Sequence, residues 1–199
     1  MKVLTTKLLF ITLLCSFLGN AQIHYEIHTA FGFSNLKITN WEKQYVIGNT
    51  YDYAPAYTIG AMMIKPLHNN MFRLQWGLEL ESLATKVGIT SQFQPDEIDL
   101  YSGVERNYFL TIPLQFSYSF EKWLYLNVGV KNKFFLKNKK DNANTYTLGF
   151  NAGVDYILNE HYRIGAGYDR DITPFTKENG KEIYWYFQQF SIKLSYVFD

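Results

Sequence analysis

The chain has 199 residues, a length that suits one domain. Aromatic residues make up 18% of it and charged residues only 19%, yet its mean hydropathy is −0.18. Beyond the first 21 residues there is no apolar run long enough for a transmembrane helix, which needs about 20 such residues. The nearly neutral charge balance gives no indication of a nucleic-acid partner.

Residues 1–21 are predicted to be a cleaved secretory signal peptide. Lys2 and Lys7 give a positive start, an apolar stretch covers residues 8–18, and small residues follow at 19–21. The apolar stretch is too short for a membrane anchor. We therefore expect the mature protein to comprise residues 22–199.

The mature chain would contain no cysteine, because Cys15 is the only one. Leu14 precedes it where a lipoprotein would carry a small residue. Loss of Lys2 and Lys7 leaves 17 basic residues against 18 acidic ones, a net charge of −1. The absence of cysteine excludes disulfides, thiol catalysis and cysteine metal sites from the mature protein.

Alternation of apolar and polar residues is clearest in three segments. Residues 72–80 place Phe72, Leu74, Trp76, Leu78 and Leu80 opposite Arg73, Gln75, Gly77 and Glu79. The same period of two returns over residues 108–120 and 146–158. Such a period predicts a β-strand with one apolar and one polar face.

Five further strands are predicted with less regular patterns, at about residues 23–34, 56–67, 123–136, 162–169 and 184–198. Asn132 interrupts an apolar face, so a bulge or a strand end is expected near it. The total is eight, an even number, and each strand has roughly the 9–11 residues that a tilted strand needs to cross a bilayer.

The predicted connections alternate strictly in length. The long ones are residues 35–55, 91–106, 137–144 and 170–183, and the short ones are 68–70, 121–122 and 159–160. Outer-membrane barrels have short periplasmic turns and longer outside loops. The sequence therefore predicts an all-β, eight-stranded antiparallel up-and-down transmembrane barrel over residues 22–199, monomeric and set in a Gram-negative outer membrane.

A soluble barrel is the alternative, with its apolar face inside and its polar face in water. The polar face here is rich in small residues, namely Gly129, Gly149, Gly153, Gly165, Gly167, Ser117, Ser119 and Asn151. Small side chains suit the cramped interior of a narrow barrel better than a solvated surface. The composition of the polar face thus favours the membrane barrel.

The stretch YFLTIPLQFSYSF, residues 108–120, resembles a strand of the PorT-like outer-membrane β-barrel family. LYLNVGV (124–130), LGFNAGVDY (148–156), RIGAGYDRDITPF (163–175) and SIKLSYVFD (191–199) are similar to later parts of that family. The resemblance implies the barrel fold, an outer-membrane location and assembly by the barrel-assembly machinery, which commonly recognises a terminal aromatic such as Phe198. Asp199 departs from that terminal pattern. No secretion role is carried over.

Charges of both signs occupy the polar face: Arg73, Lys131, Arg163 and Lys193 against Glu26, Glu79, Asp155 and Asp169. One interpretation is an ion pathway, which would make the protein a small channel. The other is a set of ion pairs that fills the lumen. An eight-stranded barrel is just wide enough to be filled by side chains, so we expect a plugged lumen.

Lipid-modifying enzymes of this membrane are a second alternative, and they need a nucleophile and a base near the outer leaflet. The four histidines, His24, His28, His68 and His161, all map to the periplasmic half. His24, Glu26 and His28 share a strand face but offer a metal no fourth ligand. We predict no catalytic, cofactor-binding or metal-binding residue, and no enzyme activity.

Two of the long connections carry charge. Residues 91–106 are acidic but lack the spacing of a calcium loop, and residues 137–144 are basic and could attract lipopolysaccharide phosphates. Aromatic girdles at the two interfaces are predicted from Tyr101, Tyr118, Trp123, Tyr156, Tyr168, Tyr184 and Trp185. The expected function is a structural or surface-interaction role, with outer-membrane lipid and lipopolysaccharide as partners.

Overall fold

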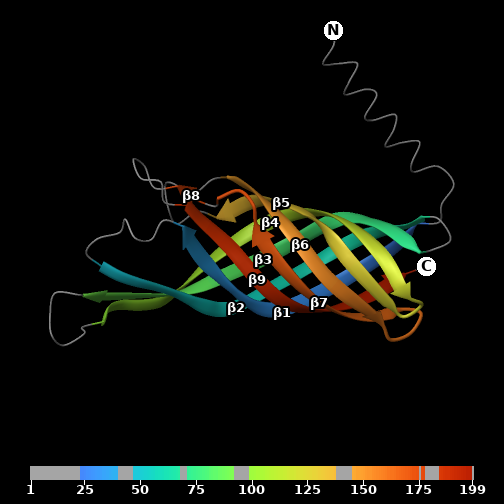
Figure 1. Cartoon of the computed structure of the whole chain (residues 1–199), viewed down its shortest axis with the longest axis horizontal. Helices are drawn as coiled ribbons and strands as arrows, with labels where there is room; N and C mark the ends of the chain where they lie inside the picture. Colours follow the sequence, from blue (N-terminus) through green and yellow to red (C-terminus); the bar gives the residue numbers. More distant parts are fainter. Residues whose placement is uncertain are drawn as a thin grey trace, which may run out of the picture.

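The computed structural model describes residues 23–39, 47–67, 71–91, 99–137, 145–174, 176–177 and 184–198. These residues form one closed antiparallel ring (Figure 1). Its strands are β1 (His24–Thr39), β2 (Ile47–Leu67), β3 (Phe72–Ser91), β4 (Asp99–Glu121), β5 (Leu124–Lys137), β6 (Tyr146–Ile157), β7 (Tyr162–Asp171) and β9 (Tyr184–Phe198). A two-residue strand, β8 (Thr176–Lys177), pairs with β9.

From β1 to β7 each strand pairs with the next along the chain, β7 pairs with β9, and β9 pairs with β1 to close the ring. The closing seam runs from Tyr25 opposite Phe198 to Thr39 opposite Tyr184. The predicted all-β, eight-stranded antiparallel barrel is thereby confirmed. Its two ends are named here by their connections: the short-turn end, where β9 finishes, and the long-loop end opposite it (Figure 1).

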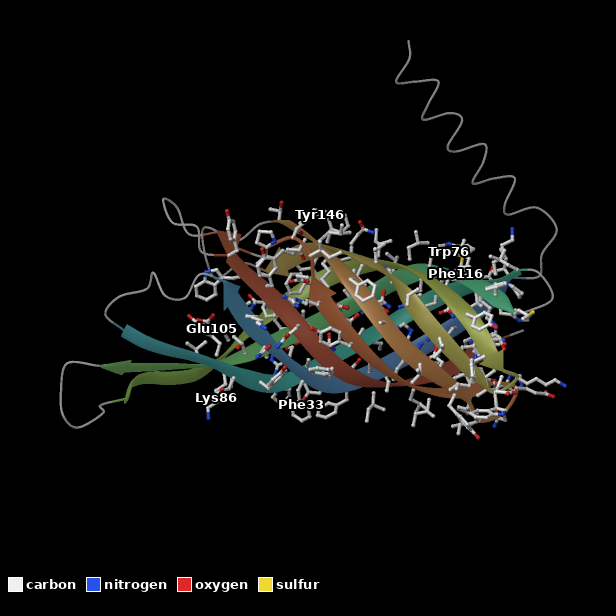
Figure 2. The ribbon with its side chains drawn as sticks, viewed as in Figure 1. Phe33, Trp76, Lys86, Glu105, Phe116 and Tyr146 are labelled. Atoms are coloured by element: carbon white, nitrogen blue, oxygen red, sulfur yellow. The ribbon has the colours of Figure 1, made fainter. Side chains whose placement is uncertain are left out.

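Side chains alternate between the two faces of the wall, with apolar groups outside and polar groups inside. Ile59 and Ile192 on the outer face are each 62% exposed, whereas Glu26 and Gln75 on the inner face are each 1% exposed. Figure 2 shows Phe33, Phe116 and Tyr146 projecting outward. This inversion of the soluble pattern is typical of a barrel wall in contact with lipid.

The outer apolar band has the height of a bilayer core. On β1 it extends from Tyr25 to Phe33, with Asn35 and Lys37 as the next outward residues. Nine residues at about 3.3 Å each, tilted by about 40°, cover about 23 Å. That height is close to the ~25 Å apolar band of outer-membrane barrels.

Three strands continue past the ring at the long-loop end, at the left of Figure 1. β2, β3 and β4 have 21, 20 and 23 residues, whereas β7 has 10. Residues 47–53, 85–91 and 99–105 pair with one another but not with β1 or β5, and are called the arm. The sequence prediction of long loops over residues 35–55 and 91–106 was wrong for these strand segments.

A bulge in β2 lies where the arm leaves the ring. The register between β2 and β3 shifts between Tyr53 and Tyr57, and Pro55 within the bulge has no N–H to give to a neighbouring strand. Ser34 of β1 bonds to β3 past this bulge. Its hydroxyl donates to the Ala84 carbonyl at 2.7 Å and accepts from the Ala84 N–H at 2.8 Å. Because the bulge and its proline interrupt the alternation, the sequence did not predict residues 47–53 as a continuation of this strand.

Asn132 is a polar residue on the outer face of β5. It pairs regularly with Ile112, and the register between β4 and β5 shifts only near the two ends of β5, between Leu124 and Tyr125 and between Phe135 and Lys137. Its amide donates to the Ile112 carbonyl at 3.3 Å and accepts from the Tyr146 hydroxyl at 2.9 Å. These bonds satisfy a polar group on a lipid-facing wall.

Within the described ranges, no helix is both long and apolar enough to cross a membrane. The predicted signal peptide, residues 1–21, lies outside the described residues.

Candidate functional site

The inner face carries a charged network that is ordered along the barrel by the inward side chains of β5. From the short-turn end these are Tyr125, Asn127, Lys131, Lys133 and Phe135. Each of these side chains lies at a different height along the barrel axis and faces different side chains from other strands. We call the ionic part of this column the lumen network.

Lys131 occupies the middle of the lumen network. Its Nζ lies 2.8 Å from Glu81 Oε1, 3.0 Å from Glu79 Oε2 and 3.3 Å from Asp169 Oδ1. The partners come from β3 and β7, on either side of β5, so these contacts cross the barrel. All four side chains are almost completely shielded from solvent. A buried charge needs such partners because its desolvation costs several kcal/mol.

A second group lies toward the short-turn end. Glu26 Oε1 lies 3.4 Å from Lys193 Nζ, and Glu26 Oε2 lies 3.4 Å from Arg163 Nη1. Lys193 also lies 3.2 Å from Asp155 Oδ2. These residues come from β1, β6, β7 and β9, so the network links the half of the wall that contains the closing seam.

His28 connects the two groups. Its Nε2 lies 3.2 Å from Glu79 Oε1 and its Nδ1 lies 3.6 Å from Glu26 Oε1. Gly60 makes room for this contact, because a Cβ there would lie 2.8 Å from His28 Cε1 and 2.7 Å from Glu79 Cγ. A larger residue at position 60 would therefore displace the imidazole from Glu79.

At the short-turn end, Arg73 donates a 2.6 Å hydrogen bond to the Tyr125 hydroxyl, and its guanidinium lies 3.7 Å from the Tyr125 ring centroid. Gln75 donates to the Ser117 hydroxyl at 2.8 Å in the same region. Polar groups therefore fill the lumen from this end to its middle.

At the long-loop end the lumen contents become apolar. Lys133 pairs with Asp171 at 2.8 Å, and the other Asp171 oxygen accepts from the Phe187 N–H at 2.9 Å. Immediately beyond lies a cluster that we call the apolar cap: Leu36, Ala56, Leu83, Phe109 and Phe187, with Tyr51, Phe135 and Trp185 packed against it. Phe109 lies at its centre, with ring centroids 5.1 Å from Phe135 and 5.8 Å from Phe187.

A small cavity lies beside the lumen network. This cavity of about 60 Å³ is bordered by residues that include His28, Lys131, Asp155 and Lys193. At roughly 10–15 Å³ for each water, it has room for about four to six water molecules.

All eight charged residues predicted for the lumen face inward, and seven of them make the ion pairs described above; the eighth, Arg73, bonds Tyr125. The prediction missed Glu81, Lys133 and Asp171, which are equally buried. Each follows a predicted residue by two positions on the same strand. Continuing the period of two past Glu79, Lys131 and Asp169 would have found them.

The histidines are placed as follows. His161 lies at the short-turn end, where its ring stacks on Tyr196 at 5.4 Å and its Nδ1 lies 3.1 Å from the Val197 carbonyl. His28 is in the lumen, and His68 lies outside the described residues. In the described part of the chain, no three His, Cys, Asp or Glu side chains are grouped to hold a metal ion.

Aromatic residues gather near both edges of the outer apolar band. Tyr118, Trp123 and Tyr156 at the short-turn end are 37–48% exposed, and Trp123 and Tyr156 are in ring contact. Trp185 does not belong to a girdle as predicted, because it points inward and contacts Tyr51 of the apolar cap. The side chain of Tyr101 lies outside the described part.

Comparison with solved structures gives the same architecture. Neisserial surface protein A (NspA) shares 11% identity, with a TM-score of 0.50 over 86% of this chain and 96% of that one. Ail, the attachment invasion locus protein of Yersinia pestis, shares 11% identity, with a TM-score of 0.44 over 88% and 98%. OprG from Pseudomonas aeruginosa shares 17%, with a TM-score of 0.43 over 90% and 98%. No curated protein sequence matches the chain significantly.

The family model for the outer membrane protein beta-barrel domain matches residues 20–198, almost the whole chain. The match agrees with a closed eight-stranded ring that has apolar residues outside and charged residues inside. The chain therefore belongs to the outer membrane protein beta-barrel domain family and is a small outer-membrane barrel with transmembrane β-strands.

Proposed function

We propose that this protein is a non-enzymatic surface barrel, whose wall anchors the segments at its long-loop end and whose lumen is plugged. The observation that carries the proposal is the filled lumen, in which the lumen network is followed directly by the apolar cap. A barrel without a continuous aqueous path does not conduct solutes, so its function would lie in the segments that it exposes at its long-loop end. The arm supports this view, since three strands extend outward beyond the membrane band.

The finer assignment within the family is to PorT-like barrels. It is supported by YFLTIPLQFSYSF, residues 108–120, which forms most of the membrane-crossing part of β4. Export would use a signal peptide cleaved near residue 21, and insertion would use the barrel-assembly machinery. The protein would act as a monomer whose partners are outer-membrane lipid and lipopolysaccharide.

Planar-bilayer recording tests the plugged lumen. The refolded mature protein is expected to give no stable unit conductance, because Lys131, Lys133 and Phe109 occupy successive levels of the lumen. A general porin reconstituted in the same bilayer is the positive control. Stable single-channel steps that depend on protein concentration would replace this proposal with the channel alternative. A change in lipid A acylation on expression of the protein would instead favour the enzyme alternative.

Thiol labelling of intact cells tests which end faces outward. Asp52 is exposed on the arm and Glu160 is exposed in the short turn between β6 and β7. Asp52→Cys is expected to react with a membrane-impermeant maleimide in intact cells, and Glu160→Cys only after the outer membrane is permeabilised. The predicted mature chain has no other cysteine to interfere. The reverse labelling pattern would invert the orientation.

A further inference from the structure

A line of hydrogen-bonded polar side chains crosses the outer face near the long-loop end. The Tyr168 hydroxyl donates to Gln188 Oε1 at 3.4 Å, and Gln188 Nε2 donates to the Tyr53 hydroxyl at 2.9 Å. On the membrane side of this line lies Phe190, whose ring centroid is 4.8 Å from that of Tyr168 and 6.1 Å from that of Tyr53. Rings below and hydroxyl groups above mark the level where lipid chains give way to headgroups.

Two cations lie directly beyond this line. Arg170 of β7 pairs in register with Gln188, and Lys37 of β1 pairs with Tyr186, the next outward residue of β9. Directly opposite side chains lie about 5 Å apart at Cβ and diagonal ones about 7–8 Å. Both cations therefore border Tyr186, from opposite sides. Both are exposed, and no hydrogen bond or ion pair from another described residue engages either side chain.

The wall is hollowed beside Arg170. A surface depression of about 540 Å³ is lined by Phe150, Tyr168, Arg170, Asp171, Ile172 and Tyr186. Asp171 is the one acidic residue in this lining, and both its oxygens are engaged from inside, by Lys133 and by the Phe187 N–H. Its charge is therefore compensated within the lumen and does not oppose an anion at Arg170.

We propose that Arg170 and Lys37 bind a phosphate group of an outer-leaflet lipid, whose chains lie against the aromatic wall below. This inference rests on the proposed function, in which outer-membrane lipid is a partner, and it assigns the residues that would bind that lipid. Guanidinium and ammonium groups are the side chains that recognise phosphate. A soluble phosphate would use the cations alone, whereas a lipid also contacts the exposed apolar surface of Phe150 and Phe190, 41% and 51% exposed.

The test is native mass spectrometry of the refolded mature protein with bisphosphorylated lipid A. Arg170→Gln and Lys37→Gln are combined in one variant, and both side chains can be replaced without removing a bond to a described residue. Each cation near an anionic surface contributes about five-fold to affinity, so the double variant is expected to bind about 25-fold more weakly. Lys122→Gln, an exposed lysine at the short-turn end, is the matched control and should bind like the wild type.

Lipid A without phosphates should bind the wild type as weakly as the intact lipid binds the double variant, and inorganic phosphate should not compete. Competition by inorganic phosphate at equal concentration would overturn the lipid as the ligand. Wild-type affinity in the double variant would overturn the site and leave the lipid partner standing. If the wild-type protein itself does not bind lipid A, both the site and the lipopolysaccharide partnership fail. Equal heat-modifiability on a gel verifies that each variant is folded.

Discussion

Replacing Lys131 with methionine is expected to destabilise the folded barrel by about 3–5 kcal/mol, the cost of breaking a buried ion pair from one side. Methionine matches the length of lysine but carries no charge. Glu79, Glu81 and Asp169 would then share a poorly solvated space without the cation that lies 2.8–3.3 Å from them. The free energy of unfolding would be measured by urea titration of the barrel in lipid vesicles.

Two further variants separate charge from packing in this experiment. Lys122→Met removes an exposed lysine and should change the free energy of unfolding little. Adding Glu81→Gln to Lys131→Met removes one of the carboxylates that lose their contact with Lys131 and should restore part of the loss. If Lys131→Met proves as harmless as Lys122→Met, water must reach these carboxylates freely, and the lumen network could not be called buried.

The membrane-crossing part of the fold was predictable because each strand there has an apolar face toward lipid and a polar face toward the lumen. The alternation over residues 72–80 and 108–120 fixed which side chains face lipid, and the structure places Leu78 and Leu114 outside and Gln75 and Ser117 inside. Loop lengths supplied the order of the strands. A strand between lipid and a polar lumen has this pattern over its whole crossing.

The arm was not predictable by the same signal. Outside the membrane, a strand no longer separates lipid from lumen, so its faces need not differ in polarity. Residues 47–53 and 99–105 show no alternation, and Pro55 together with Gly48 and Asn49 reads as turn chemistry. Their pairing with β3 depends on contacts between strands, which no local pattern in one strand reveals.

The sequence predicted most of the charged residues that face the lumen, but it did not predict which of them form ion pairs with one another. Facing inward follows from position in a strand, which is how Lys131 and Glu79 were found. Which cation meets which carboxylate depends on strand register and tilt, as the contact of Glu26 on β1 with Arg163 on β7, past the intervening strand β9, shows. The inward turn of Trp185 into the apolar cap was missed for a related reason, since an aromatic near a strand end suits an interfacial girdle equally well.

Deletion of Tyr196–Asp199 is expected to abolish insertion into the outer membrane. The deleted residues include the backbone partners of Tyr25, Glu26 and Ile27 at the closing seam. They also include Val197, whose N–H donates to the His161 carbonyl at 2.8 Å. An open strand edge in lipid leaves backbone groups without partners, and each unsatisfied group costs several kcal/mol. The truncated chain should therefore be degraded or remain in the periplasm, as membrane fractionation would reveal.

Controls distinguish the seam from the terminal aromatic as a recognition signal. Deletion of Asp199 alone keeps every seam pair and should leave insertion unchanged. Phe198→Ala keeps the backbone ladder but removes the terminal ring, so failure of this variant would implicate recognition by the assembly machinery rather than closure. A soluble domain would tolerate loss of the last four residues as a frayed tail. A truncated protein that still fractionated with the outer membrane and ran as a compact, heat-modifiable band would contradict the requirement for a closed seam.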